Sequence, residues 1–136
     1  MADQQINAIV KGLEKLTERV VSKITLDITA NLIETTPIDT GWARANWVPA
    51  IGTPYLADLG GPKPSSAGIS SQATEQAAAT AKVATGYKLS MGKVFVSNNV
   101  PYILKLNQGW SSQAPAAFVQ RAIHKAVTED IKGIKG

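Results

Sequence analysis

Residues 39–41, Asp-Thr-Gly, spell the motif that carries the catalytic aspartate of aspartic proteases. In those enzymes two aspartates face each other and share a proton, so a homodimer would have to supply the second one. Asp39, however, follows the helix-stopping pair Thr36-Pro37 instead of an apolar strand. The simpler interpretation is a turn in which the Asp39 side chain accepts hydrogen bonds from nearby backbone N–H groups. A dimeric aspartic protease is therefore the last of the alternatives.

The other reactive side chains lack the spacing of a catalytic or cofactor site. The chain has no cysteine and a single histidine, His124, which excludes disulfides, thiolate metal sites and histidine clusters. Ser111 and Ser112 are not in a Gly-x-Ser-x-Gly turn, and residues 60–62 (Gly-Gly-Pro) do not open a phosphate-binding helix. The neighbours Glu129 and Asp130 fit the exposed end of a helix. We expect no enzyme activity, no cofactor and no metal.

The first element that the sequence predicts is a long helix from Asp3 to Thr35. Apolar residues recur at spacings of mostly three and four, which places them on one stripe. They are Ile6, Ile9, Val10, Leu13, Leu16, Val20, Ile24 and Ile28. Leu26 and Ile33 fall on the opposite side. A continuous helix would be about 50 Å long, against roughly 37 Å for the diameter of the domain. Either the helix breaks near Thr25 or Thr29, or its overhang packs on another subunit.

The remaining sequence predicts a small sheet and two more helices. Strands are expected at 44–51, at a sheet edge because of Pro49, and at 93–97. Residues 52–70 are rich in glycine and proline and predict a flexible loop. A helix is expected at 71–85 with an alanine face (Ala73, Ala77, Ala81, Ala84), and another at 115–132 that buries Phe118, Val119, Ala122, Ile123, Ala126 and Val127. The predicted fold is one α+β domain over 1–136, in which a long N-terminal helix and a C-terminal helix pack on a small antiparallel sheet with an inserted alanine-rich helix.

The net charge of +4 is unevenly distributed along the chain. Residues 1–75 carry six basic and eight acidic side chains, whereas 76–136 carry eight basic and two acidic ones. Such asymmetry favours an acidic neighbour or nucleic acid on one side, although a solvated basic surface is equally consistent with it. The basic residues concerned are Lys82, Lys88, Lys93, Lys105, Arg121 and Lys125.

Two blocks of sequence carry a resemblance to a known family. Residues 36–47 read Thr-Pro-Ile-Asp-Thr-Gly-Trp-Ala-Arg-Ala-Asn-Trp, and residues 98–116 read Asn-Asn-Val-Pro-Tyr-Ile-Leu-Lys-Leu-Asn-Gln-Gly-Trp-Ser-Ser-Gln-Ala-Pro-Ala. Together they resemble the neck and tail-completion (minor tail, head–tail joining) proteins of long-tailed bacteriophages. The family often has Glu shortly before the glycine of the second block, where this chain has Asn107.

The resemblance implies a virion structural protein of the phage neck or upper tail, assembled in the host cytoplasm. It would form a homo-oligomeric ring that completes the tail and joins it to the head connector. The implied partners are other copies of the chain, the connector or stopper, the tail terminator or tail tube proteins, and genomic DNA passing through the lumen. A tail terminator or head-completion stopper is the closest alternative. The rival from another class is a small basic nucleic-acid-binding module, against which the basic residues are dispersed.

Residues in and beside the two blocks are the candidates for interaction. Large aromatic residues on turns are enriched at protein interfaces, which favours contact roles for Trp42, Tyr102 and Trp110, whereas Trp47 in an apolar segment fits the core. Arg44 and Gln113 join this set, as do Leu26 and Ile33 on the long helix. No apolar run reaches the ~18 residues of a membrane span, and the first residues lack the layout of a signal peptide. We therefore expect no membrane partner.

Overall fold

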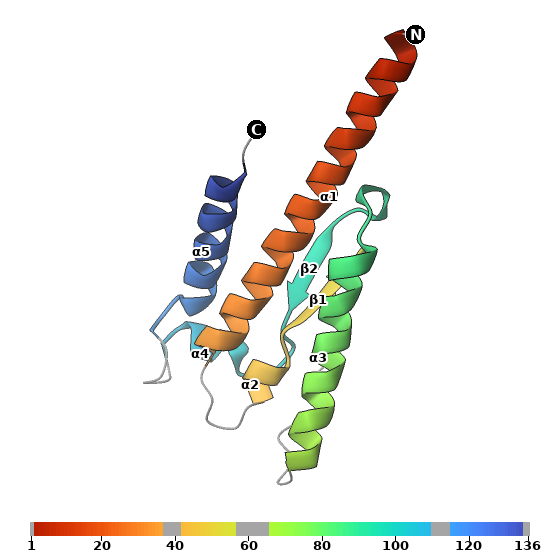
Figure 1. Ribbon diagram of the computed structural model, residues 1–136. Coiled ribbons are helices and arrows are strands. Elements are labelled where there is room, and N and C mark those ends of the chain that lie inside the picture. Colours follow the sequence, from red (N-terminus) through yellow and green to blue (C-terminus); the bar gives the residue numbers. More distant parts are fainter. Residues whose placement is uncertain (1, 37–41, 57–65, 110–114, 135–136) are drawn as a thin grey trace.

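The computed structural model describes residues 2–36, 42–56, 66–109 and 115–134. It confirms the predicted α+β architecture, with a long N-terminal helix, a two-stranded antiparallel sheet and a C-terminal helix (Figure 1). The elements are α1 (Ala2–Thr35), α2 (Trp42–Ala45), β1 (Val48–Ile51), α3 (Ser66–Gly86), the 3₁₀ turn η1 (Leu89–Met91), β2 (Val94–Ser97), α4 (Ile103–Asn107) and α5 (Phe118–Gly133).

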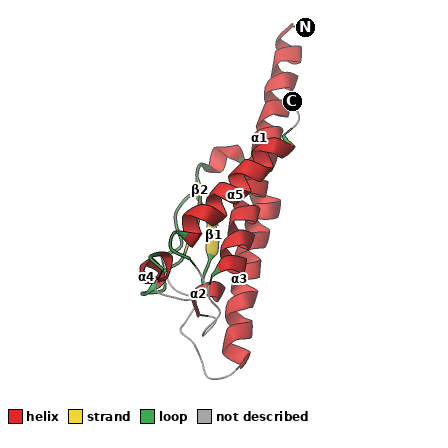
Figure 2. Ribbon diagram, turned by 90° about the vertical axis from the view of Figure 1, so that its left-hand side faces the viewer, coloured by secondary structure: helices red, strands yellow, loops and turns green. Residues whose placement is uncertain are grey.

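Helix α1 is continuous from Ala2 to Thr35, so of the two alternatives the break near Thr25 or Thr29 does not occur. Thr25 and Thr29 keep the helix intact because their hydroxyls donate to the carbonyls one turn earlier, those of Val21 and Thr25, each at 2.8 Å. At 1.5 Å per residue the helix is about 51 Å long. Its N-terminal end projects beyond every other element in both views (Figures 1 and 2). The helix therefore overhangs its own domain.

The C-terminal half of α1 is covered on two sides. Thr25, Thr29 and Leu32 are buried, and α1 contacts α3, β2 and α5 along this half. The predicted stripe of Ile24 and Ile28 is half-buried. Because threonines satisfy their hydroxyls within the helix, one buried side of α1 carries polar residues that apolar periodicity does not reveal.

The sheet pairs β1 with β2 in the register Val48↔Ser97 to Ile51↔Val94. Pro49 stands opposite Val96, in a two-stranded sheet where every strand has a free edge, as predicted. The predicted strand from Arg44 is wrong at its start, since residues 42–45 form the short helix α2. The Arg44 side chain holds this turn against the end of α1, where its Nε donates to the carbonyl of Ile33 at 2.6 Å.

Helix α3 differs from the prediction in length and in orientation. It begins at Ser66, so the end of the predicted 52–70 loop is helical, while residues 57–65 lie outside the described residues. The predicted alanine face is wrong, because Ala77, Ala81 and Ala84 are exposed. The buried side carries Val83 and Gln76 instead, whose Nε2 donates to the carbonyls of Trp47 at 2.9 Å and Arg44 at 3.1 Å. One amide thus fixes α3 against α2 and β1.

The core lies where α1 and α5 meet Trp47, the residue before β1. Leu32, Trp47, Phe118 and Ala122 form its buried cluster, with half-buried residues from β2 and α4 packed around it. Helix α5 begins at Phe118, three residues later than Pro115, because Ala117 adopts a left-handed conformation (φ 64°) and serves as the N-cap. Phe118, Ala122 and Ala126 are buried as predicted, whereas Ile123 is 39% exposed.

Candidate functional site: an exposed helix face and the polar junction that continues it

The overhanging half of α1 exposes large apolar side chains. Ile9 and Leu13 are 63% and 59% exposed, and their neighbours on the stripe are uncovered to a similar extent. These residues are Ile6, Ile9, Val10, Leu13 and Leu16, which we call the α1 stripe. Asp3 stands one turn before Ile6 at the start of the stripe, and the other charged residues of this half (Lys11, Glu14, Lys15, Glu18 and Arg19) fall off its line. Isolated exposed apolar residues are normal, but a contiguous, charge-free row of them marks an interaction surface.

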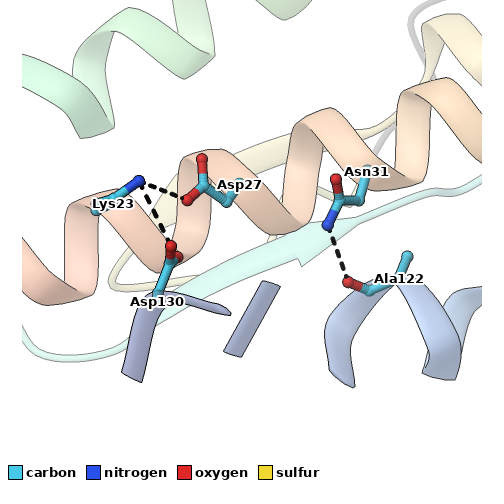
Figure 3. Close-up of polar contacts among 5 residues, drawn as sticks. All are labelled: Lys23, Asp27, Asn31, Ala122 and Asp130. Atoms are coloured by element: carbon cyan, nitrogen blue, oxygen red, sulfur yellow. Dashed lines mark hydrogen bonds and ion pairs between the residues drawn. The ribbon is translucent and has the colours of Figure 1, made fainter. Parts of the chain in front are cut away.

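The stripe continues into the contact between α1 and α5. Steps of three and four residues lead from Leu16 through Val20 to Lys23, Asp27 and Asn31, and the last three face α5 (Figure 3). The same side of α1 is therefore covered by α5 in its C-terminal half and bare in its N-terminal half.

Polar groups hold α5 on this face (Figure 3). Lys23 Nζ lies 2.9 Å from Asp27 Oδ2 and 3.4 Å from Asp130 Oδ1. One turn after Asp27 on α1, Asn31 Nδ2 donates to the carbonyl of Ala122 at 3.3 Å. The lysine side chain is 66% exposed, whereas that of Asp130 is 8% exposed. The carboxylate, not the ammonium, is the buried partner.

The pKa values of the two carboxyls of this junction, Asp27 and Asp130, are shifted in opposite directions. Burial, together with the neighbouring Asp27, raises the pKa of Asp130 above its ordinary value. Partial burial acts in the same direction on Asp27, but hydrogen bonds from Lys23 and Asp130 outweigh it and leave the pKa of Asp27 lowered. Both carboxyls raise the pKa of Lys23, Asp27 the more strongly. Asp130 is thus the carboxyl of the pair that holds a proton more readily.

The junction has neither the composition nor the geometry of a metal site. Asp130 Oδ2 is buried without a hydrogen-bond partner, but among the described residues no three acidic or histidine side chains gather closely enough to hold a metal ion. The predicted exposed pair of Glu129 and Asp130 is corrected for Asp130, which turns toward α1. The open groove here, about 730 Å³ between α1 and the end of α5, is lined by Leu16, Val20 and Ile134 beside the polar residues.

Leu26 and Ile33 lie on the part of α1 that the domain already covers. Both are half-buried. Ile33 packs against the core cluster, and Leu26 lines a groove that it shares with Ala84 and Tyr87. Their contact with another subunit stays a prediction, but the overhang presents the α1 stripe, not these two residues.

The two family-like blocks are described in part. Arg44 is committed to the end of α1, since its Nη2 also donates to the carbonyl of Glu34, at 3.2 Å. Tyr102 is half-buried at the start of α4. Trp42 opens α2, and of its side chain nothing is described. Trp110, Gln113 and the serines between them lie outside the described residues, as do Asp39 and the pair Gly60-Gly61.

The basic residues do not come from one element. All six are exposed, on α3, on the two flanks of η1, on α4 and on α5 (Lys82, Lys88, Lys93, Lys105, Arg121 and Lys125). Helices α3 and α5 lie on opposite sides of α1 (Figure 1). This distribution gives little support to a single basic face. His124 is exposed on α5.

Asn107 has a role that sequence reasoning missed. Ala117, the N-cap of α5, has no side-chain acceptor, and Asn107 Oδ1 accepts from Val119 N at 2.9 Å in its place. Asn107 O also accepts from Ala117 N at 2.6 Å. The residue that stands where the phage family often has Glu therefore caps the last helix from a distance.

Comparison with known proteins gives no relative. No family model matches the chain, and neither a curated protein nor a solved structure is similar to it. Within the described residues no helix has the length and apolarity needed to cross a membrane.

Proposed function

We propose that the chain is a non-enzymatic structural protein of a bacteriophage neck or upper tail, where copies of it assemble into a ring that joins the tail to the head connector. The observation that supports this proposal is the overhang of α1 with its bare, charge-free stripe. A contiguous apolar helix face that projects from the domain is what a subunit of an assembly presents to its neighbour. The two family-like sequence blocks supply the viral context.

The size of the stripe is adequate for self-association. Full burial of one Val, Leu or Ile side chain contributes ~1.5–3 kcal/mol. Since five such side chains are about half exposed, covering them contributes roughly 4–8 kcal/mol per copy. Association costs ~4–15 kcal/mol in lost freedom of motion. A contact that buries the stripes of two copies roughly offsets this cost, and one that buries a single stripe against a polar surface does not.

The experiment is electron microscopy of the purified full chain, combined with light scattering over a range of concentrations. We expect closed rings of uniform size. A chain that stays monomeric at every concentration contradicts the proposal. Binding of labelled double-stranded DNA, measured at low and at physiological salt, tests the rival: strong binding by the monomer favours the nucleic-acid-binding module. Antibody labelling of virions separates a neck position from that of a terminator or stopper.

A further inference from the structure

Helix α5 leaves a vacant position along α1. It ends at Gly133, beside Leu16 and Val20 of α1, and α1 continues past it for some 15 residues with the same face uncovered. Ile131 and Ile134, at the end of α5, are themselves 56% and 42% exposed. Apolar side chains of both helices thus border the place where another helix would extend the line of α5, beside the polar groups of the groove.

We propose that this place is taken by the overhang of a second copy of the chain, running antiparallel to the first. The N-terminal end of α1 and the C-terminal end of α5 lie toward the same end of the molecule (Figure 1), so α5 runs antiparallel to α1. An antiparallel second α1 starts where α5 stops and continues in the same direction. It covers the first stripe while its own stripe is covered in return.

The stripe matches itself in this orientation. Its residues are spaced nearly symmetrically about residue 11, so that Ile6 of one copy lies opposite Leu16 of the other, and Ile9 opposite Leu13. The two overhangs have the same length, so neither extends past the surface that the other offers. Burial is mutual, as the energetics of the stripe require.

Other occupants fit less well. A parallel second α1 would run on from the stripe into the space that α5 of the first copy already fills, over Lys23, Asp27 and Asn31. A nucleic acid or an acidic protein would find no basic group along the stripe itself. The vacancy therefore favours a copy of the chain, antiparallel.

The inference rests on the self-assembly part of the proposed function and not on the viral context. A two-fold contact closes on two copies. It makes a pair, and a ring of such pairs needs a second interface. The pair is thus the unit from which the larger assembly is built.

Cross-linking tests the pair directly, because the chain has no cysteine of its own. Three variants are oxidised under the same conditions: Ile6→Cys, Leu16→Cys and the double variant. In the antiparallel pair, position 6 meets position 16, whereas equal positions are about 15 Å apart along the axis, too far for a disulfide. We expect a covalent dimer from the double variant only. Leu104→Cys, exposed on α4, measures cross-linking by random collision.

Each result of these measurements supports or overturns the antiparallel pair or the ring. Single variants that cross-link as well as the double variant indicate parallel helices and overturn the inference. The inference is also overturned if the double variant cross-links no more than Leu104→Cys does and the wild type is monomeric in light scattering. Rings without the 6–16 link contradict the pair and leave the proposed function standing. Linked dimers that never form larger particles contradict the ring and leave the pair standing. Melting temperatures close to the wild type confirm that the exposed positions 6 and 16 tolerate cysteine.

Discussion

At the scale of single residues, the second family-like block works through backbone geometry. Asn98 Oδ1 accepts from Val100 N at 3.1 Å, and its Nδ2 donates to the carbonyl of Ala43 at 2.7 Å. β2 ends at Ser97, just before it, as the sequence predicts. Gly109 ends the turn of α4 at φ +92°, where a Cβ would lie 3.3 Å from that of Ala116. These residues route the chain from β2 to α5 and hold no reactive group.

Asn107 supports the first prediction. Asn107→Ala removes the acceptor of Val119 N and should lower the free energy of unfolding by about 0.5–2 kcal/mol, the usual value for a lost helix cap. Asn107→Asp keeps an acceptor at the positive end of α5 and should restore most of that loss. Chemical denaturation of the three proteins measures both effects. Equal losses in the two variants would mean that the amide acts through its bond to Gln120 instead.

A second prediction concerns the buried hydroxyl of Thr36. It accepts from Trp47 Nε1 at 2.7 Å and donates to the carbonyl of Leu32. Thr36→Val keeps the shape but leaves the indole N–H buried without a partner, which should cost about 1–3 kcal/mol. Thr36→Ser keeps the hydroxyl and is the matched control. Thermal unfolding measures the difference, and a valine variant as stable as the serine variant would contradict it.

At the scale of the elements, the junction of α1 and α5 gives the two carboxyls opposite pH dependences. The raised pKa of Asp130 means that its ionised form disfavours folding. This loss develops as pH rises from the ordinary value of 3.8 through the raised folded value. Asp130→Asn abolishes the loss. The melting temperature of the wild type minus that of this variant should therefore fall as pH rises from about 3.5 to 7.

Asp27→Asn is the matched control for Asp130→Asn. The lowered pKa of Asp27 gives a stabilisation that is present above the ordinary value and lost as pH falls through the folded value. The melting temperature of the wild type minus that of Asp27→Asn should therefore rise with pH. Melting curves over the pH range measure both differences. Parallel pH dependences in the two variants would show that the carboxyls are not divided as described.

The three long helices and their C-terminal ends were predictable from the sequence because they depend on local signals. Spacing predicted α1 and α5, and Pro37 marked the end of α1 within two residues. The buried side of each helix was harder to predict. The buried side of α1 depends on Thr25 and Thr29, and that of α3 on Gln76, and each satisfies its polar atoms by a bond that only the fold reveals. The helix at residues 42–45 was missed, and the bond from its Arg44 side chain to the carbonyl of Ile33 on α1 is a contact that local spacing does not reveal.

The sequence predicted that an apolar face of α1 forms the interaction surface, but not which face. The length of α1 predicted either a break or an overhang, and the stripe was visible in the sequence. That α5 covers this face only as far as Leu16 and Val20 required the structure. Leu26 and Ile33, chosen because they lie off the stripe, turned out to face the domain itself. Which side of α1 is covered and which is exposed depends on where α5 ends, and the spacing of apolar residues does not encode this.

At the scale of the whole molecule, the stripe is the surface on which assembly should depend. Ile9→Gln with Leu13→Gln places two polar side chains in the middle of it. Because both residues are about 60% exposed in the single chain, the melting temperature measured at low concentration should change by no more than a few degrees. Self-association should weaken by at least tenfold, since each tenfold step corresponds to ~1.4 kcal/mol and burial of two half-exposed aliphatic side chains contributes more than that.

Leu104→Gln is the matched control for this loss. Leu104 is 73% exposed on α4, away from the stripe, so the same chemical change there should leave the pairing of two stripes as it is in the wild type. Light scattering across a dilution series measures all three proteins. Equal weakening by both variants would point to general apolar adhesion and not to a defined surface. A double variant that unfolds would place Ile9 and Leu13 in the core of the subunit. Only weaker association in a fold of normal stability fits a helix whose outer half is completed by another copy.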